Sequence, residues 1–227
     1  RLDKAIDAAA EPVTTQHVGD GVTFFGKGLS PFFLALSQWF GVLITYMIMK
    51  PFNRRAIDSG TSPLRVLLYT MIPSFIIGFV QSVALWVMQV CILNIEPVHP
   101  LTMFGVLVFV SWVFVAAILA LNTALGPAPG RLATMALMSL QLVASNGLYP
   151  PEVQPEFIQW VHSWDPMRYS VDLMRYALFD TTSYDPRMWT AVTVLLAVGV
   201  GAVVISCLAL RARRVMQLRD LHPELTV

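Results

Sequence analysis

Opposite charges recur at helical spacing near residue 170 of this sequence. Arg168, Asp172 and Arg175 follow one another at i, i+4 and i+7, so a helix would place them on one face and allow two ion pairs. Each exposed pair of this kind is worth only a few tenths of a kcal/mol. We interpret the three side chains as a candidate recognition surface, with a structural ion-pair stripe as the alternative.

Aromatic residues accompany these charges. Trp160 and Trp164 share one helical face with Phe157 and Val161, and Tyr169 opens the following segment. Tryptophan and tyrosine are enriched at membrane–water boundaries, where their rings have one apolar and one wet end. We therefore expect the aromatic residues to anchor an amphipathic element at such a boundary.

Isolated polar side chains interrupt two apolar runs. Ser74, Gln81 and Gln89 fall within one arc of a helical wheel, and Gln141 and Ser145 fall within an arc of another. Polar groups in hydrocarbon need partners, so these faces should contact other helices or an internal cavity. They are a candidate intramembrane lining, with interhelical hydrogen bonding as the alternative.

Catalytic and metal-binding patterns are not found. Gly26-Lys27-Gly28 lacks the spacing of a phosphate-binding loop, and the four histidines are too far apart in sequence to suggest a zinc site. We expect no enzyme activity, no metal and no cofactor. Cys91 and Cys207 should lie in opposite leaflets as free thiols, too far apart for a disulfide.

The composition is that of an integral membrane protein. The chain is 56% hydrophobic and only 13% charged, values that a soluble globular protein does not have. We predict an all-α polytopic fold with an amphipathic or re-entrant helical hairpin over residues 150–179. Five apolar runs are long enough to cross about 30 Å of hydrocarbon: about 29–49, 66–94, 101–125, 131–148, which Arg131 opens, and 188–210.

Local signals mark the breaks between these elements. Gly126-Pro-Ala-Pro-Gly130 should end the third span, and Asp165-Pro166 should cap and begin the second helix of the hairpin. The second span is longer than a straight crossing requires. A kink at Pro73 or a tilt of the helix would absorb the excess length. No charged residue lies in the middle of a span, so directional work would need energy from outside the chain.

Loop charges predict the orientation. If the C-terminal tail is cytoplasmic, the inner segments carry more Lys and Arg than the outer ones, as the positive-inside rule requires. The inner set is Lys50, Arg54, Arg55, Arg65, Arg131, Arg211, Arg213, Arg214 and Arg219. The N-terminus would then be outside, with residues 1–22 the end of an extracellular domain or linker, 23–214 the membrane domain and 215–227 a cytoplasmic tail. Because the chain starts at Arg1, we expect it to be a piece of a longer protein.

Two segments resemble the C-terminal membrane region of the phage infection protein (YhgE/Pip) family, which belongs with the type 2 ABC transporter permeases. The first is GLSPFFLALSQWFGVL (28–43), and the second covers residues 145–179. The second matches a Gly-x-Tyr-Pro turn followed by a Pro-x-x-Tyr-x-Val-Asp-x-x-Arg segment. Its matching positions are Gly147, Tyr149, Pro150, Pro166, Tyr169, Val171, Asp172 and Arg175.

The resemblance implies roles for two regions. In related permeases the first inner loop contacts a nucleotide-binding subunit, which makes Arg54, Arg55 and Asp58 candidate coupling residues, with ordinary loop topology as the alternative. The outer hairpin of these permeases acts as a gate. The matching candidates here are Trp160, Trp164, Arg168, Tyr169, Asp172 and Arg175.

Three functions follow as hypotheses. The first is a permease-like subunit of an export or secretion system in the bacterial plasma membrane, moving a lipid, glycan or peptide substrate. Its partners would be membrane lipids, a cytoplasmic ATPase subunit and a second copy or another membrane subunit, with no nucleic acid. The alternative is a non-transporting anchor, such as a phage receptor or a type VII secretion accessory. An intramembrane enzyme ranks last.

Overall fold

The computed structural model describes residues 27–49, 62–145, 155–179 and 186–212. Within these ranges the regular structure is entirely helical. This confirms the predicted all-α class. The elements are α2 (Ser30–Ile48), α4 (Pro63–Val87), the π-helical turn η2 (Met88–Ile92), α5 (Pro100–Leu125), α6 (Pro127–Ala144), α7 (Glu156–Trp164), α8 (Pro166–Phe179) and α9 (Pro186–Ala212).

Proline begins most of these helices. Proline lacks an N–H and has a helical φ, so it is accommodated in a first turn whose N–H groups have no partner within the helix. At the α5–α6 boundary, Gly126 has φ 104° and separates Leu125 from Pro127. The predicted break between the helices therefore occurs. It is confined to Gly126, so α6 begins at Pro127 instead of the predicted Arg131.

Four described helices are long and apolar enough to cross a membrane. They are Ser30–Ile48, Leu64–Ile92, Pro100–Leu125 and Arg187–Ala212, which correspond to the first, second, third and fifth predicted spans. The fourth predicted span, 131–148, corresponds to α6, an 18-residue helix that starts with Pro-Ala-Pro-Gly-Arg and is less apolar. That α6 also crosses the membrane stays a prediction.

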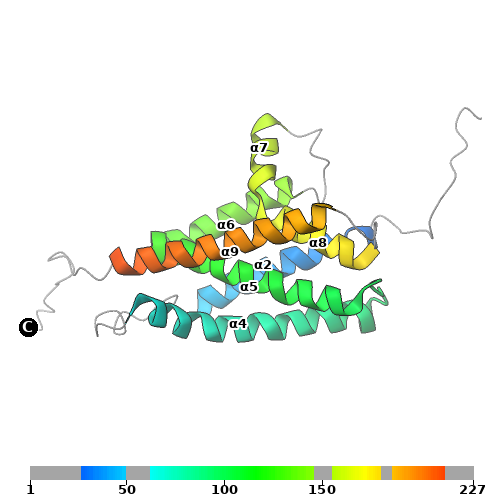
Figure 1. Cartoon of the computed structure of the whole chain (residues 1–227), viewed down its shortest axis with the longest axis horizontal. Coiled ribbons are helices and arrows are strands. Elements are labelled where there is room, and N and C mark those ends of the chain that lie inside the picture. The colour runs from blue at the N-terminus through cyan, green and yellow to red at the C-terminus, as the bar shows by residue number, and fades with distance from the viewer. Residues whose placement is uncertain (1–26, 50–61, 146–154, 180–185, 213–227) are drawn as a thin grey trace, which may run out of the picture.

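Helix α5 is the centre of the bundle, packed against α2, α4, α6, α8 and α9 (Figure 1). Its side chains Leu107, Phe114 and Ile118 are fully buried. The Phe114 ring meets Trp39 of α2 edge to face, with centroids 4.9 Å apart. In its most apolar stretch 61% of the residues are buried, against 17% in α4, so α5 is a core helix and α4 a peripheral one.

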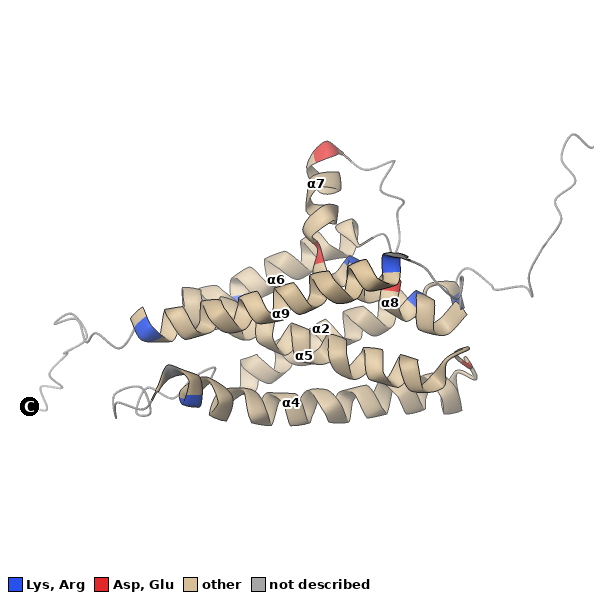
Figure 2. Ribbon diagram, viewed as in Figure 1, with Lys and Arg blue, Asp and Glu red and all other residues tan. Residues whose placement is uncertain are grey.

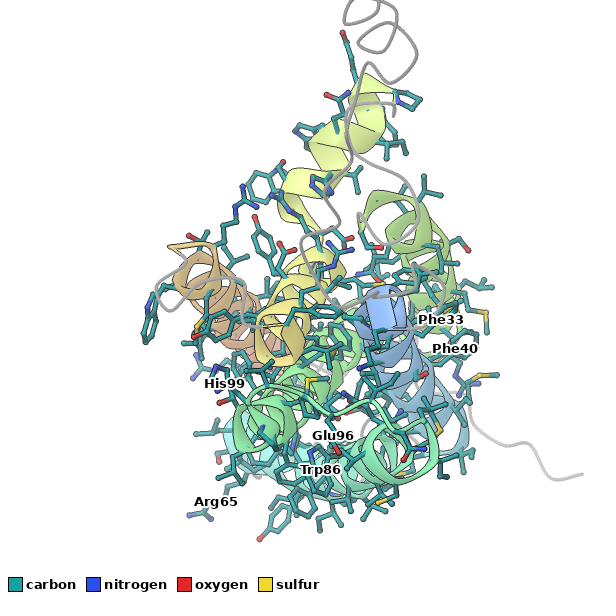
Figure 3. The ribbon with its side chains drawn as sticks, turned by 90° about the vertical axis from the view of Figure 1, so that its right-hand side faces the viewer. Phe33, Phe40, Arg65, Trp86, Glu96 and His99 are labelled. Atoms are coloured by element: carbon teal, nitrogen blue, oxygen red, sulfur yellow. The ribbon has the colours of Figure 1, made fainter. Side chains whose placement is uncertain are left out.

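The peripheral helices present large apolar side chains outward. Figure 3 views the bundle from one end and shows Phe33 and Phe40 on the outer side of α2; both are exposed. Helices α4 and α9 carry further exposed Leu, Ile, Val and Phe side chains. A bundle that is apolar outside as well as inside suits lipid, because water would penalise this surface.

The long helices carry charged residues, where they have any, only near their ends (Figure 2). The C-terminus of α2, the N-terminus of α4 and the α5–α6 turn share one end of the bundle, while α8 and the η2–α5 connection reach the other, and α7 projects sideways from about the middle of its length (Figure 1). Cys91 and Cys207 are free and sit near opposite ends, as expected from the alternating direction of the spans.

Candidate functional site

The predicted hairpin region contains two helices of different character. Helix α8 buries Met167, Val171 and Met174 completely and packs against α5, α9 and α2. Its backbone carbonyl at Ala177 also accepts a hydrogen bond from His99 N (3.1 Å). Helix α8 is therefore packed into the bundle, because its apolar face is covered by other helices; whether the hairpin is interfacial or re-entrant stays a prediction.

Helix α7 projects away from the bundle, as Figure 1 shows. Phe157, Trp160 and Trp164 are exposed, and their rings follow one another at 6.4 and 6.5 Å between centroids. Val161, predicted to share their face, is instead buried together with His162. The predicted face is thus divided, since Val161 is buried while the aromatic side chains are exposed.

The predicted ion-pair stripe is present on α8. Asp172 lies 3.9 Å from the Arg168 guanidinium and 4.0 Å from that of Arg175, and all three side chains are about one-third exposed. Burial raises the pKa of Asp172, and Arg175 and Arg168 oppose that rise. At these distances and this exposure the pairs contribute little to stability, so they fix side-chain positions more than they stabilise the fold.

Helix α8 also holds the C-terminal end of α7. Arg168 Nη1 donates to the carbonyl of His162 (3.3 Å), and the Tyr169 hydroxyl donates to the carbonyl of Ser163 (2.9 Å). The last carbonyls of a helix have no partner within it, and these two side chains supply partners. The Arg168 guanidinium carbon additionally lies 5.2 Å from the centroid of the Tyr169 ring, so the two side chains that hold α7 also contact each other.

Asp165 forms the elbow between α7 and α8. Its Oδ1 accepts a hydrogen bond from Met167 N (3.0 Å), which caps α8 as predicted. Only 3% of the residue is exposed, and its Oδ2 has no hydrogen-bond partner. Burial raises the pKa of this carboxyl to about 7, opposed by the Met167 and Arg168 backbone amides, by Gln141 and by the charge of Arg168.

Helix α6 closes this junction from the other side. His162 Nδ1 forms a short hydrogen bond with the carbonyl of Ala144, while Gln141 and Ser145 are buried. The Gln141 amide lies close enough to Asp165 to lower its pKa, but it makes no hydrogen bond of normal geometry, and neither does the Ser145 hydroxyl. The structure thus brings two of the predicted lining residues to the hairpin.

The α4 stripe makes interhelical hydrogen bonds over part of its length. Gln81 Nε2 donates to the Ser37 carbonyl of α2 (2.7 Å). The neighbouring Ser82 accepts from Gln38 Nε2 (3.0 Å), which also reaches the Leu107 carbonyl of α5 (3.3 Å). These contacts favour the interhelical interpretation for Gln81, because its amide is used in holding α2 to α4.

The two ends of the stripe differ from Gln81. Ser74 is buried and donates weakly to the carbonyl of Thr70 (3.4 Å) in its own helix. Gln89 lies in η2, fully buried, and neither amide atom has a partner. Buried unpaired amides are costly, and π-helical turns are frequent at functional sites, so Gln89 stays a candidate lining residue.

Sequence reasoning missed two buried groups with polar contacts. Gln38 is the only Gln, Asn or charged residue in α2, and that isolation was the available signal. His162 could not be recognised, because its carbonyl partner on α6 is distant in sequence. Among the described residues no group of three His, Cys, Asp or Glu side chains could hold a metal ion. The predicted coupling residues Arg54, Arg55 and Asp58 lie outside the described residues.

Comparison with known proteins gives two matches. The model of the ABC-2 family transporter proteins matches residues 3–211. The uncharacterized protein YhgE of Bacillus subtilis (strain 168) is 25% identical over 212 residues, which cover 90% of this chain and 26% of YhgE. The chain therefore spans about a quarter of the length of this curated relative.

Proposed function

The chain belongs to the ABC-2 family of transporter proteins, and on that premise we propose that it exports a lipid, glycan or peptide with energy from an ATPase partner. The family predicted from residues 28–43 and 145–179 is thereby confirmed, with YhgE as a relative. The chain is a transporter-like membrane subunit located in a membrane. Its substrate, its energy source and its orientation belong to the proposal.

The observation that carries the proposal is the family match over nearly the whole chain. The distribution of charge supports it, because the described spans carry Lys, Arg, Asp or Glu only near their ends. Charged groups buried within spans are the usual elements of proton-driven transport. A bundle without them in its described part suits a transporter driven by a separate subunit.

The proposed coupling residues fall in the sequence between two helix ends that share one end of the bundle, whereas α8 of the proposed gate extends to the other end (Figure 1). Arg54, Arg55 and Asp58 lie in the sequence between Ile48, which ends α2, and Pro63, which begins α4. Both helix ends lie at the end of the bundle away from α8 in Figure 1, while α7 projects from the side of the bundle between the two ends. We place the coupling end in the cytoplasm and the α7–α8 gate outside, with the C-terminal tail cytoplasmic, in a bacterial plasma membrane. A dimer or heteromeric complex would enclose the substrate path.

A co-purification experiment tests the energy source. The tagged chain would be purified from its native membranes in mild detergent, and a nucleotide-binding subunit should be recovered with it. Changing Arg54, Arg55 and Asp58 to Ala should release that subunit. Arg65→Ala is the matched control, because Arg65 is exposed in the first turn of α4 at the same end of the bundle. Recovery of the subunit with the triple variant would contradict the coupling assignment.

The second candidate is a non-transporting anchor or receptor, and the length of the relative favours it. The match covers only 26% of YhgE, so most of that protein lies outside the matched region. An anchor would work through such an additional region, and its phenotype would survive replacement of this chain by an unrelated membrane anchor. Loss of the phenotype on replacement, together with ATPase recovery, would leave the transporter.

A further inference from the structure

The elbow between α7 and α8 buries a carboxyl group whose partners are incomplete. Asp165 is 3% exposed, and only its Oδ1 is hydrogen-bonded. Oδ2 has no partner, and the nearby Gln141 amide also has both atoms unpaired. A neutral carboxyl places no charge in this buried position, whereas an ionised one leaves a buried charge with an oxygen that has no partner.

Helix α7 depends on this junction for its position. Its aromatic side is exposed, and three hydrogen bonds attach its C-terminal half to the neighbouring helices: His162 to the Ala144 carbonyl, Arg168 to the His162 carbonyl, and Tyr169 to the Ser163 carbonyl. Asp165 follows Trp164 directly. A change at Asp165 therefore acts at the C-terminal base of this short helix.

We propose that Asp165 is a proton-binding latch, which holds α7 against α6 when the carboxyl is neutral and loosens it when the carboxyl is ionised. The inference concerns this chain's own conformation and does not depend on the substrate or the energy source. The pKa of the buried carboxyl, raised to about 7, places the change near neutral pH. The latch would be closed below that value and loosened above it.

The charged and titratable neighbours come from two helices. Arg168 on α8 faces Asp165 and favours its ionised form, but it already donates to the His162 carbonyl and pairs with Asp172. His162 on α7 is the second titratable group at the junction. Helix α6 contributes Gln141, which does not titrate. The one charged residue of α6, Arg131, lies at the other end of that helix.

Distances between spin labels test the latch directly. Labels would be placed at Ser139→Cys on α6 and Glu156→Cys on α7, both exposed positions, with Cys91 and Cys207 replaced by Ala. The chain would be reconstituted in lipid nanodiscs and measured by pulsed electron spin resonance between pH 5 and 9. We expect a narrow distance distribution at low pH that broadens at least twofold in width with a midpoint near pH 7.

Three variants identify the side chain that binds the proton. Asp165→Asn, a permanently neutral isostere, should keep the narrow distribution at every pH. His162→Gln retains a donor for the Ala144 carbonyl and should keep the pH response, as should Asp172→Asn, which alters the other carboxyl of the hairpin. A distribution in the parent chain that does not change with pH would overturn the proposal. A pH response that persists in Asp165→Asn would also overturn it, and so would a pH response that disappears in His162→Gln. If one of these variants does not fold, the parent chain and the other variants still decide the question.

Discussion

Gly41 on α2 lies directly against the side chain of Gln81 on α4. A Cβ added to Gly41 would come within 2.2 Å of the Gln81 amide atoms, and the same amide donates to the Ser37 carbonyl one turn earlier on α2 (2.7 Å). The missing side chain at Gly41 is thus what allows the interhelical hydrogen bond to form. Close approach at a small residue combined with a polar contact is a common way for helices to associate in lipid.

The first prediction concerns this pair. Gly41→Ala should displace the Gln81 amide, break its bond to Ser37 and destabilise the protein by about 1–2 kcal/mol. Thermal unfolding in detergent, followed by tryptophan fluorescence, measures the loss. In a Gln81→Ala background the same substitution should cost much less, because the displaced group is gone. Equal costs in both backgrounds would contradict the assigned contact.

The second prediction uses the α5–α6 turn. A Cβ on Gly130 would lie 2.7 Å from the Asn122 Cα and 3.0 Å from the Leu121 carbonyl oxygen, and backbone cannot move aside as a side chain can. Gly130→Ala should therefore destabilise the bundle by about 1–3 kcal/mol. Gly105→Ala is the control, since nothing lies within 4 Å of its Cβ position on α5 and alanine favours helix. The same unfolding assay should find Gly105→Ala neutral or stabilising.

The third prediction tests how α8 holds α7. Tyr169→Phe removes the donor to the Ser163 carbonyl and costs about 0.5–1.5 kcal/mol, so amide exchange in α7 should accelerate roughly two- to tenfold. Hydrogen–deuterium exchange with mass spectrometry of peptides covering 156–164 measures it. Tyr176→Phe, on the same helix but stacked on His99, should leave α7 unchanged.

The fourth prediction concerns sidedness. Val98, in the η2–α5 connection, and Ala128, in the first turn of α6, are exposed in segments at opposite ends of the bundle, and Trp160 is exposed on α7, which projects from its side. Single cysteines at positions 160 and 98, without Cys91 and Cys207, should react with a membrane-impermeant maleimide in intact cells, whereas a cysteine at 128 should react only after permeabilisation. Labelling of position 160 only from the cytosol would reverse the proposed orientation.

The fifth prediction is the pH dependence of stability. Burial raises the pKa of Asp165 in the folded protein to about 7, whereas the pKa of an aspartate in an unfolded chain is about 4. The folded state therefore binds more protons between these values, and stability should fall as pH rises from about 4 to about 7 and then level off. Asp172, whose pKa is also raised, contributes in the same direction. Asp165→Asn should remove part of the slope seen in melting temperature against pH, and an unchanged slope would exclude Asp165 as its source.

Much of the fold follows from the sequence alone. Uncharged runs long enough to span hydrocarbon, ended by charges, glycine and proline, predict the helices because every backbone group in lipid must be paired within its own segment. Three local features follow from the sequence in the same way: the break at Gly126, the capping of α8 by Asp165, and the ion pairs among Arg168, Asp172 and Arg175. Periodicity fixes local structure because the contacts involved lie within about one helical turn.

The tertiary structure decided everything that depends on partners distant in sequence. Nothing local distinguishes a span like α5, most of which is buried, from one like α4, most of which is exposed, because both are strongly apolar. Packing also turned Val161 inward and its aromatic neighbours outward, and it joined Gln81 to Ser37 and His162 to Ala144. It left Asp165 buried with one unpaired oxygen. Burial and pairing depend on which helices meet, and that choice depends on the shapes of all the side chains between them.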